Sequence, residues 1–308
     1  TDALGEVSIS ENAYWGAQTE RSLKNFAIGE DKFPKVFIKN YALLKKIAAQ
    51  ANLVAKELSE KKAKLIMQAC DEILKGKYDD QFPLSIWQTG SGTQTNMNLN
   101  EVIANLASEL AGKELGSKYI HPNDDVNKGQ SSNDSFPTAM QMSIVELLET
   151  DFLPAAKALI LSLRNKAEEF KSILKIGRTH LMDAVPMTCT QEFEAWACLL
   201  EEALININHS QKWLLELPIA GTAIGTGINC SKNFGKDFIE ILNGCTGLAF
   251  TQAENKFSKI SAHDNVAAIS ANLKIFAGSL NKVANDIRWL GSGPRCGLSE
   301  LLLPENEP

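Results

Sequence analysis

Two long apolar stripes constrain the fold of this chain more than any other feature of its sequence. In both stripes, apolar side chains recur at alternating spacings of three and four residues, which is the a and d pattern of a heptad repeat. One stripe runs through residues 193–214, with a single polar member at Gln211, and the other runs through residues 266–290. Helices of this length measure on the order of 35–45 Å, at ~1.5 Å per residue. The sequence therefore predicts an all-α fold built around a long antiparallel helix bundle.

The chain divides at a proline into two predicted domains. Residues 1–137 are expected to form an N-terminal, mainly helical domain, and residues 138–308 the long-helix bundle domain. Helical periodicity supports both domains at residues 40–59, 64–74, 100–110, 138–149 and 154–170. The glycine-rich segment 221–227 lacks the Lys-Ser/Thr that completes a phosphate loop, so it is predicted to connect two helices.

Composition places the chain among ordinary globular proteins. It has 308 residues, of which 44% are hydrophobic and 22% charged. No stretch approaches the roughly 20 apolar residues of a membrane helix, so no membrane role is expected. The formal net charge of −6 argues against a nucleic-acid partner. An acidic protein that binds an acidic metabolite must concentrate its positive potential locally.

Cysteine and histidine spacing gives no sign of a metal site. The six cysteines are scattered without a CxxC pair, and the four histidines show no HxxxH pair. We expect reduced, mostly buried thiols rather than a disulfide framework in a chain of this size. No metal and no organic cofactor is predicted.

Three polar segments precede regions of helical periodicity, at residues 90–96, 130–134 and 177–180. Helix N-termini carry unpaired N–H groups and a partial positive charge, which makes them anion sites. Each segment alone could be a helix cap or an ordinary loop. Together, their hydroxyl and amide side chains suit a ligand with two carboxylates, and Arg178 and His180 would add a cation and a group that titrates near neutrality. The pattern predicts an enzyme that acts on a dicarboxylic acid.

Four longer motifs, at residues 87–98, 121–127, 130–134 and 177–181, occur in the order found in class II fumarases, which they closely resemble. The stretches 14–19 and 292–297 match as well, so the resemblance covers the whole chain. Aspartases, the nearest relatives of that family, typically carry Gln at the position of His180 and Thr at that of Ser132. Argininosuccinate and adenylosuccinate lyases share the bundle but not these loop sequences.

The resemblance implies reversible hydration of fumarate to (S)-malate through a stabilised carbanion, or aci-carboxylate, without a metal or organic cofactor. It implies that His180 transfers a proton on the hydroxyl or water side. The residues implied to hold the substrate are Ser91, Gly92, Thr93, Ser131, Ser132, Asn133 and Thr179. Preorganised neutral donors of this kind stabilise the charge that develops on a carboxylate when the neighbouring carbon loses its proton.

The resemblance also implies a second, peripheral dicarboxylate site. Its residues would be Lys118, His121, Pro122, Asn123 and Asp124. The family often has Arg at the position of Lys118. A lysine can meet a carboxylate there, but without the bidentate fork of a guanidinium.

Members of this family are homotetramers whose active sites are shared between subunits. We therefore expect the three polar segments to meet between chains rather than within one. The expected location is the cytoplasm, with the mitochondrial matrix as the alternative.

The end of the chain departs from the family pattern. Residues 303–308 correspond to the sequence that directly precedes a mobile GSSxMPxKxN loop, which supplies the family's catalytic serine, a lysine and an asparagine. The last bundle helix and the C-terminal domain would also follow. We expect a polypeptide that ends at Pro308 to have negligible hydratase activity. Two other functions stay open: an aspartase, which releases ammonia from aspartate, and a non-catalytic helical oligomerisation module.

Overall fold

The chain folds into two compact units. The structure is a computed structural model that describes residue 2 and residues 4–305, so the last three residues of the stretch 303–308 lie outside it. The first unit comprises residues 1–145 and 214–263, and the second comprises residues 146–213 and 264–308. Residues 214–263 thus pack with the N-terminal part of the chain. The domain boundary expected after Pro137 stays a prediction, and the compact units group the chain differently.

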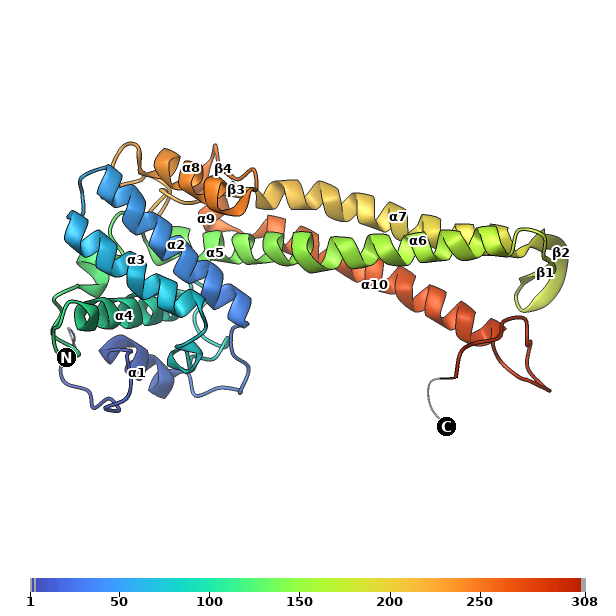
Figure 1. The fold of residues 1–308 in the computed structure, drawn as a ribbon, viewed down its shortest axis with the longest axis horizontal. Helices are drawn as coiled ribbons and strands as arrows, with labels where there is room; N and C mark the ends of the chain where they lie inside the picture. The colour runs from blue at the N-terminus through green and yellow to red at the C-terminus, as the bar shows by residue number, and fades with distance from the viewer. Residues whose placement is uncertain (1, 3, 306–308) are drawn as a thin grey trace. The chain divides into compact units, whose positions relative to one another are not determined.

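The first unit is mainly helical (Figure 1). Within it, α2 packs against α3, and α3 packs against α4. Their bounds, with those of the neighbouring helices, are α1 Ala17–Asn25, α2 Lys35–Val54, α3 Glu60–Leu74, α4 Thr93–Leu110 and α5 Ser132–Leu147. The α2 helix buries most of one face, while Val54, its last residue, is exposed. Helices α3 and α4 begin earlier than their periodicity suggested because their polar first turns carry no apolar signal, and α2 also begins earlier, at Lys35.

A carboxylate buried beneath α1 fixes the start of the chain against α4. Glu101 of α4 accepts hydrogen bonds from the backbone N–H groups of Gly16, Gln18 and Thr19, at 2.8, 2.9 and 3.1 Å. It also accepts one from the Thr19 hydroxyl at 2.6 Å. These N–H groups form the first turn of α1, which its own preceding residues cannot bond. One side chain therefore caps α1 and joins it to the core.

The later part of the first unit completes its core. Two short parallel strands, β3 (Glu216–Leu217) and β4 (Thr251–Gln252), frame α8 (Phe234–Thr246), and α9 (Lys256–Ser261) follows. Helix α8 packs against α2, with Phe234 and Phe238 fully buried. The segment 221–227 lies between β3 and α8. It is a loop, as predicted, although a short strand precedes it rather than a helix.

The second unit is built from long helices and one hairpin (Figure 1). A π-helical turn, Leu148–Phe152, leads into α6 (Leu153–Glu169), and α7 (Cys189–Leu214) and α10 (Asp264–Leu290) follow. Arg164 of α6 pairs with Glu201 of α7 at 2.6 Å, and Asn272 of α10 donates to Ser210 of α7 at 3.0 Å. The antiparallel hairpin of β1 (Leu174–Thr179) and β2 (Met182–Thr188) joins α6 to α7.

Burial confirms the whole first apolar stripe, and half of the second, as core-facing. Every member of the first stripe is buried, Gln211 included, and its amide donates to Glu149 at 2.6 Å. The buried members are Phe193, Ala197, Leu200, Leu204, Ile207, Gln211 and Leu214. In the second stripe burial recurs every seventh residue, at Ile269, Phe276, Val283 and Leu290. The intervening members, such as Leu273 and Leu280, are only half-buried within one chain.

The observed architecture confirms the predicted all-α class, with two small two-stranded sheets added. None of the helices within the described part of the chain combines the length and the apolar character needed to cross a membrane.

Replacing Glu101 with Gln should destabilise the first unit. An amide cannot accept on both sides, so its NH₂ group would oppose a backbone N–H of α1. We expect a loss of about 1–3 kcal/mol in the free energy of unfolding, measured by urea denaturation. Glu114→Gln, at an exposed position after α4, should change it by less than about 0.5 kcal/mol. Equal denaturation midpoints for the two variants would contradict the capping role of Glu101.

Candidate active site

The first of the three polar segments contains the glycine that directly precedes α4. Gly92 is the N-cap of the helix and adopts a left-handed conformation with φ of 66°. A Cβ atom at this position would lie 2.1 Å from the ring of Phe136. Both the backbone conformation and the close packing therefore require glycine. The next residues, Thr93 and Gln94, form the open first turn of the helix.

The second segment forms a capping box at the start of α5. The Ser131 hydroxyl accepts from the backbone N–H of Asn133 at 3.3 Å, and Asp134 accepts from the N–H of Ser131 at 2.9 Å. The helix begins at Ser132, not near Pro137 as the sequence suggested, and Pro137 lies inside it. Ser132 and Asn133 thus belong to the first turn of α5.

A chain of hydroxyl groups joins these two helix starts. Thr93 Oγ1 lies 2.9 Å from Ser132 Oγ and 3.1 Å from Ser91 Oγ. Ser91 Oγ lies 3.0 Å from Thr89 Oγ1, which donates to Gln94 Oε1 at 2.6 Å. Each hydroxyl has a single hydrogen, and that of Thr89 is donated to Gln94. Ser91 therefore donates to Thr89, Thr93 donates to Ser91, and Ser132 donates to Thr93. The structure thus brings Ser91, Thr93 and Ser132, three predicted substrate residues, into direct contact.

The glycine-rich loop 221–227 contacts the same helix start, which the sequence had not indicated. Asn133 Nδ2 donates to the carbonyl of Ala223 at 2.8 Å. The Thr222 N–H donates to Asp134 Oδ2 at 2.8 Å, so both oxygens of this buried carboxylate meet backbone donors. Burial raises the pKa of Asp134, and the two N–H groups and the charge of Lys45 oppose that rise. The run of small residues in the loop was the sequence feature that could have indicated this contact.

A buried lysine lies behind the two helix starts. Lys45 of α2 is fully buried, and its ammonium donates to Asn96, Asn127 and Gln130. Burial lowers the pKa of Lys45 to about 7, and the charge of Asp134 acts in the opposite direction. The sequence shows Lys45 only as one half of an ordinary Lys-Lys pair, and its burial follows from its place one turn after Tyr41 on the inward face of α2.

The third segment corrects the expectation that all three precede helices. Thr179 ends β1, and His180 and Leu181 form the two-residue tip of the hairpin before β2. Both tip residues are left-handed, with φ of 52° and 66°, a conformation normally left to Asn and Gly. All three side chains are exposed. Strain of this kind at a non-glycine tip is typical of functional sites.

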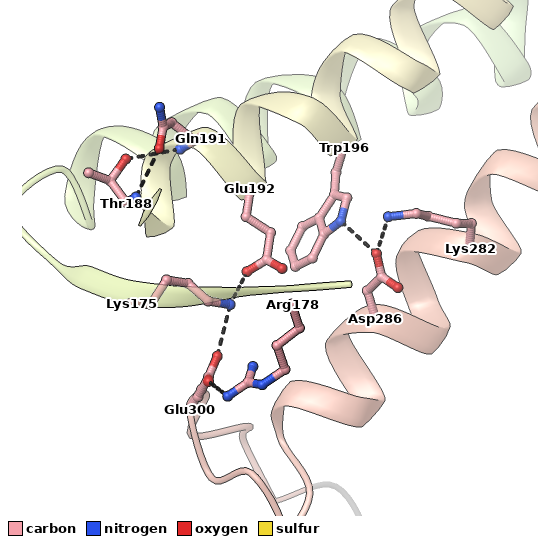
Figure 2. Close-up of polar contacts among 9 residues, drawn as sticks. All are labelled: Lys175, Arg178, Thr188, Gln191, Glu192, Trp196, Lys282, Asp286 and Glu300. Atoms are coloured by element: carbon pink, nitrogen blue, oxygen red, sulfur yellow. Dashed lines mark hydrogen bonds and ion pairs between the residues drawn. The ribbon is translucent and has the colours of Figure 1, made fainter. Parts of the chain in front are cut away.

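Arg178 is not a free cation for substrate. Figure 2 shows its guanidinium turned toward Glu300, which also receives Lys175 at 2.8 Å, and Lys175 pairs with Glu192 as well. Burial alone would raise the pKa of Glu300, but its hydrogen bonds with Arg178 and Lys175 outweigh that effect and lower it. The expected role of Arg178 as a fixed cation for the ligand stays a prediction, since within this chain its charge is paired with Glu300. Its charge instead joins β1 to the segment after α10.

The predicted substrate residues consequently fall into two groups. Ser91, Gly92, Thr93 and residues 131–133 belong to the first compact unit, where they lie together. Thr179 and His180 belong to the second unit.

Four of the five predicted peripheral residues line a cavity of the first unit, and Asp124 does not. This cavity, of about 490 Å³, is bordered by Lys118, His121, Pro122 and Asn123, and on other sides by Trp15 and Glu101. His121 Nδ1 accepts from the N–H of Asp124 at 3.1 Å and caps the π-helical turn Pro122–Val126.

Among residue 2 and residues 4–305, no three His, Cys, Asp or Glu side chains are placed so that they could hold a metal ion. The donors at the two helix starts are hydroxyls, amides and backbone N–H groups. Such a set suits carboxylate oxygens rather than a cation.

Comparison with known proteins identifies relatives along the whole chain. Residues 5–308 match the profile of a family described as Lyase. The chain is 52% identical over 309 residues to a class II fumarate hydratase of Thermus thermophilus. The aligned region covers 100% of this chain and 66% of that protein. It is 48% identical over 307 residues to the Staphylococcus aureus protein of the same name, of which it covers 67%. The chain thus spans about two thirds of the length of these relatives.

Solved structures agree with the sequence comparison. The crystal structure of a class II fumarase from Schistosoma mansoni superposes with a TM-score of 0.97 at 42% identity, covering 100% of this chain and 68% of that one. A fumarate lyase:delta crystallin from Brucella melitensis gives a TM-score of 0.95 at 40% identity, with 100% and 67% covered. With the family profile, the close relatives and the superposed folds in agreement, the chain belongs to the lyase family and, within it, to the class II fumarases.

Proposed function

We propose that this protein catalyses the reversible hydration of fumarate to (S)-malate. The observation that carries the proposal is the contact between Thr93 and Ser132, which joins the starts of two helices through a continuous set of hydroxyl donors. Membership of the class II fumarases supports the choice of substrate. A four-carbon diacid presents carboxylates of the size and charge that paired helix starts accommodate.

The chemistry of the reaction matches the donors at these helix starts. Removing a proton from the carbon beside a carboxylate places an additional negative charge on that carboxylate. Ser91, Thr93 and Ser132 can turn their hydroxyl hydrogens toward the developing charge without moving heavy atoms. Preorganised donors of this kind stabilise the more highly charged intermediate more than the ground-state carboxylate. The aci-carboxylate is therefore the species that these residues would stabilise.

His180 would handle the proton on the oxygen side of the reaction. Hydroxide is a poor leaving group unless it is protonated, and an imidazole can serve as the general acid that donates this proton. The exposed, strained hairpin tip presents its ring at the surface of the second unit. Thr179, the residue before it, would contribute a further hydroxyl to the substrate.

A homotetramer with shared sites would bring the two groups of residues together. The hairpin exposes several apolar side chains, including Leu174, Met182 and Val185, which are 71, 71 and 64% exposed. Trp289 near the end of α10 is 50% exposed. Exposed apolar surface of this extent is typical of an interface between subunits. Cytoplasmic location is part of the same proposal.

The cavity beside Lys118 and His121 would hold a second dicarboxylate outside the catalytic centre. Its volume of about 490 Å³ is ample for a four-carbon acid. The Lys118 ammonium would supply the positive potential.

Replacing His180 with Asn should remove most turnover while preserving the fold. Asparagine tolerates the left-handed conformation of the hairpin tip, so the change removes the imidazole without adding backbone strain. We expect kcat to fall by roughly 10²- to 10⁴-fold, followed through the ultraviolet absorbance of fumarate. His209→Asn, on an exposed face of α7, is the matched control and should retain activity. Undiminished turnover in the His180 variant would refute its role, and ammonia release from aspartate by the parent protein would identify an aspartase instead.

Replacing Thr93 with Val should weaken transition-state stabilisation. Valine keeps the shape of threonine but removes the hydroxyl that links Ser91 to Ser132. The loss of one such donor is expected to lower kcat/KM by roughly 10²-fold. Thr150→Val, which removes an exposed hydroxyl in the second unit, is the matched control. Equal kcat/KM values for the two variants would contradict the assignment of Thr93.

A further inference from the structure

Lys45 occupies a position where an ammonium group is costly. Its side chain belongs to the largest fully buried side chains in the described chain, in the middle of α2. An unpaired buried charge is strongly unfavourable, so this group must find compensating partners. Two of the three partners that it finds, Asn96 and Gln130, belong to the polar segments that carry the candidate site.

The three partners match the geometry of a protonated amine. Lys45 Nζ donates to Asn96 Oδ1 at 2.7 Å, to Asn127 Oδ1 at 2.9 Å and to Gln130 Oε1 at 3.0 Å. An ammonium has three N–H donors and no acceptor, so three oxygens satisfy it completely. A neutral amine would turn a lone pair toward one of these oxygens. The contacts therefore fit the charged form, with Asp134 as the nearby compensating carboxylate.

These contacts join the starts of α4 and α5 from behind. Asn96 lies one turn after Thr93 in α4, and Gln130 directly precedes Ser131, the N-cap of α5. Asn127 connects the other two, since it accepts from Asn96 at 3.2 Å and donates to the carbonyl of Gln130 at 3.2 Å. The ammonium is thus the common point of a buried amide cluster beneath both hydroxyl-bearing turns.

A neighbouring tyrosine strengthens the same link. The Tyr41 hydroxyl donates to Asn96 Oδ1 at 2.9 Å and lies 2.8 Å from Ser135 Oγ. Ser135 also donates to the carbonyl of Ser131 at 2.7 Å. The face of α2 that holds the ammonium therefore contacts both helix starts at more than one point.

We propose that Lys45 is a positioning residue for the dicarboxylate site: by holding Asn96, Asn127 and Gln130, it sets the spacing between Thr93 on α4 and Ser132 on α5. This inference rests on the proposed function of those two turns. Lys45 itself does not touch the substrate, because it lies in the layer behind the hydroxyls. Its effect is to keep the two sets of donors at the separation that one carboxylate requires.

The test compares Lys45→Met with Leu44→Ala in the complete protein. Methionine keeps the length and apolar stem of lysine but removes the three donors, whereas Leu44→Ala opens a cavity at the next residue of α2. Both variants should lower Tm. Only the Met variant should bind (S)-malate more weakly, by about 10- to 100-fold, because displaced donors no longer meet the ligand together. Affinity is measured by titration calorimetry below both melting temperatures, and kcat and KM are measured in parallel.

The separation of KM from kcat distinguishes positioning from mere stability. A variant that only leaves fewer folded molecules lowers apparent kcat and leaves KM unchanged, whereas displaced donors raise KM. If folded Lys45→Met keeps an affinity and a KM within about twofold of the parent values, this inference is overturned and the proposed function is not affected. A parent protein that binds no (S)-malate would overturn the proposed function and this inference with it.

A second variant decides the matter if Lys45→Met does not fold. Asn127→Leu removes one acceptor of the ammonium at a half-buried position and leaves Lys45 in place. A loss of affinity of about threefold or more supports the inference, and a smaller loss overturns it.

Discussion

The N–H groups at the start of a helix must find acceptors, and this requirement shapes the first unit. Helix α1 meets it with the Glu101 carboxylate, and α5 meets it with Ser131 and Asp134. Helix α4 begins at a glycine without a side-chain cap, and its third N–H bonds to Gln88 Oε1 at 3.1 Å. The first turns of α4 and α5 therefore stay open toward the hydroxyls between them. The proposed anion-binding site therefore depends on how these two helices begin.

Much of the scaffold could be predicted because it follows from periodicity. The first heptad stripe is buried along its whole length, which is what a period of three and four residues implies. Only half of the second stripe is buried within one chain, because burial recurs every seventh residue, at positions such as Ile269 and Phe276. A stripe seen in sequence does not distinguish a neighbour in the same chain from one in another subunit.

The candidate site was predictable in its residues but not in its geometry. Ser91, Thr93 and Ser132 stand out as polar residues ahead of helices, and the structure places them in contact. The hairpin at residues 174–188 was missed because its exposed strands carry apolar side chains without regular alternation, and because its tip holds His180 and Leu181 instead of Asn-Gly. Sequence-local signals describe turns well only when the usual turn residues are present.

Long-range partners explain the remaining differences. From the sequence, Arg178 was expected to be a cation for the ligand. In the structure it donates to Glu300, which lies 122 residues away in the sequence. Lys45 reads as a surface residue because a Lys-Lys pair gives no hint that one member points inward. Burial and pairing of charges depend on which segments meet in space, and a single sequence does not specify those meetings.

The order of donors among the hydroxyls has a consequence for how fast the site can respond. The Gln94 oxygen accepts the hydrogen of Thr89 at one end of the row. The hydroxyl hydrogens therefore all point toward that end, in the order Ser132, Thr93, Ser91 and Thr89. When an arriving anion accepts the hydrogen bond of one hydroxyl, the neighbouring hydroxyl oxygen loses its donor. The hydrogen bonds along the row then rearrange by rotation about C–O bonds. Such rotations move only the lightest atoms, and the surrounding helices can remain still while the electrostatic field between them changes.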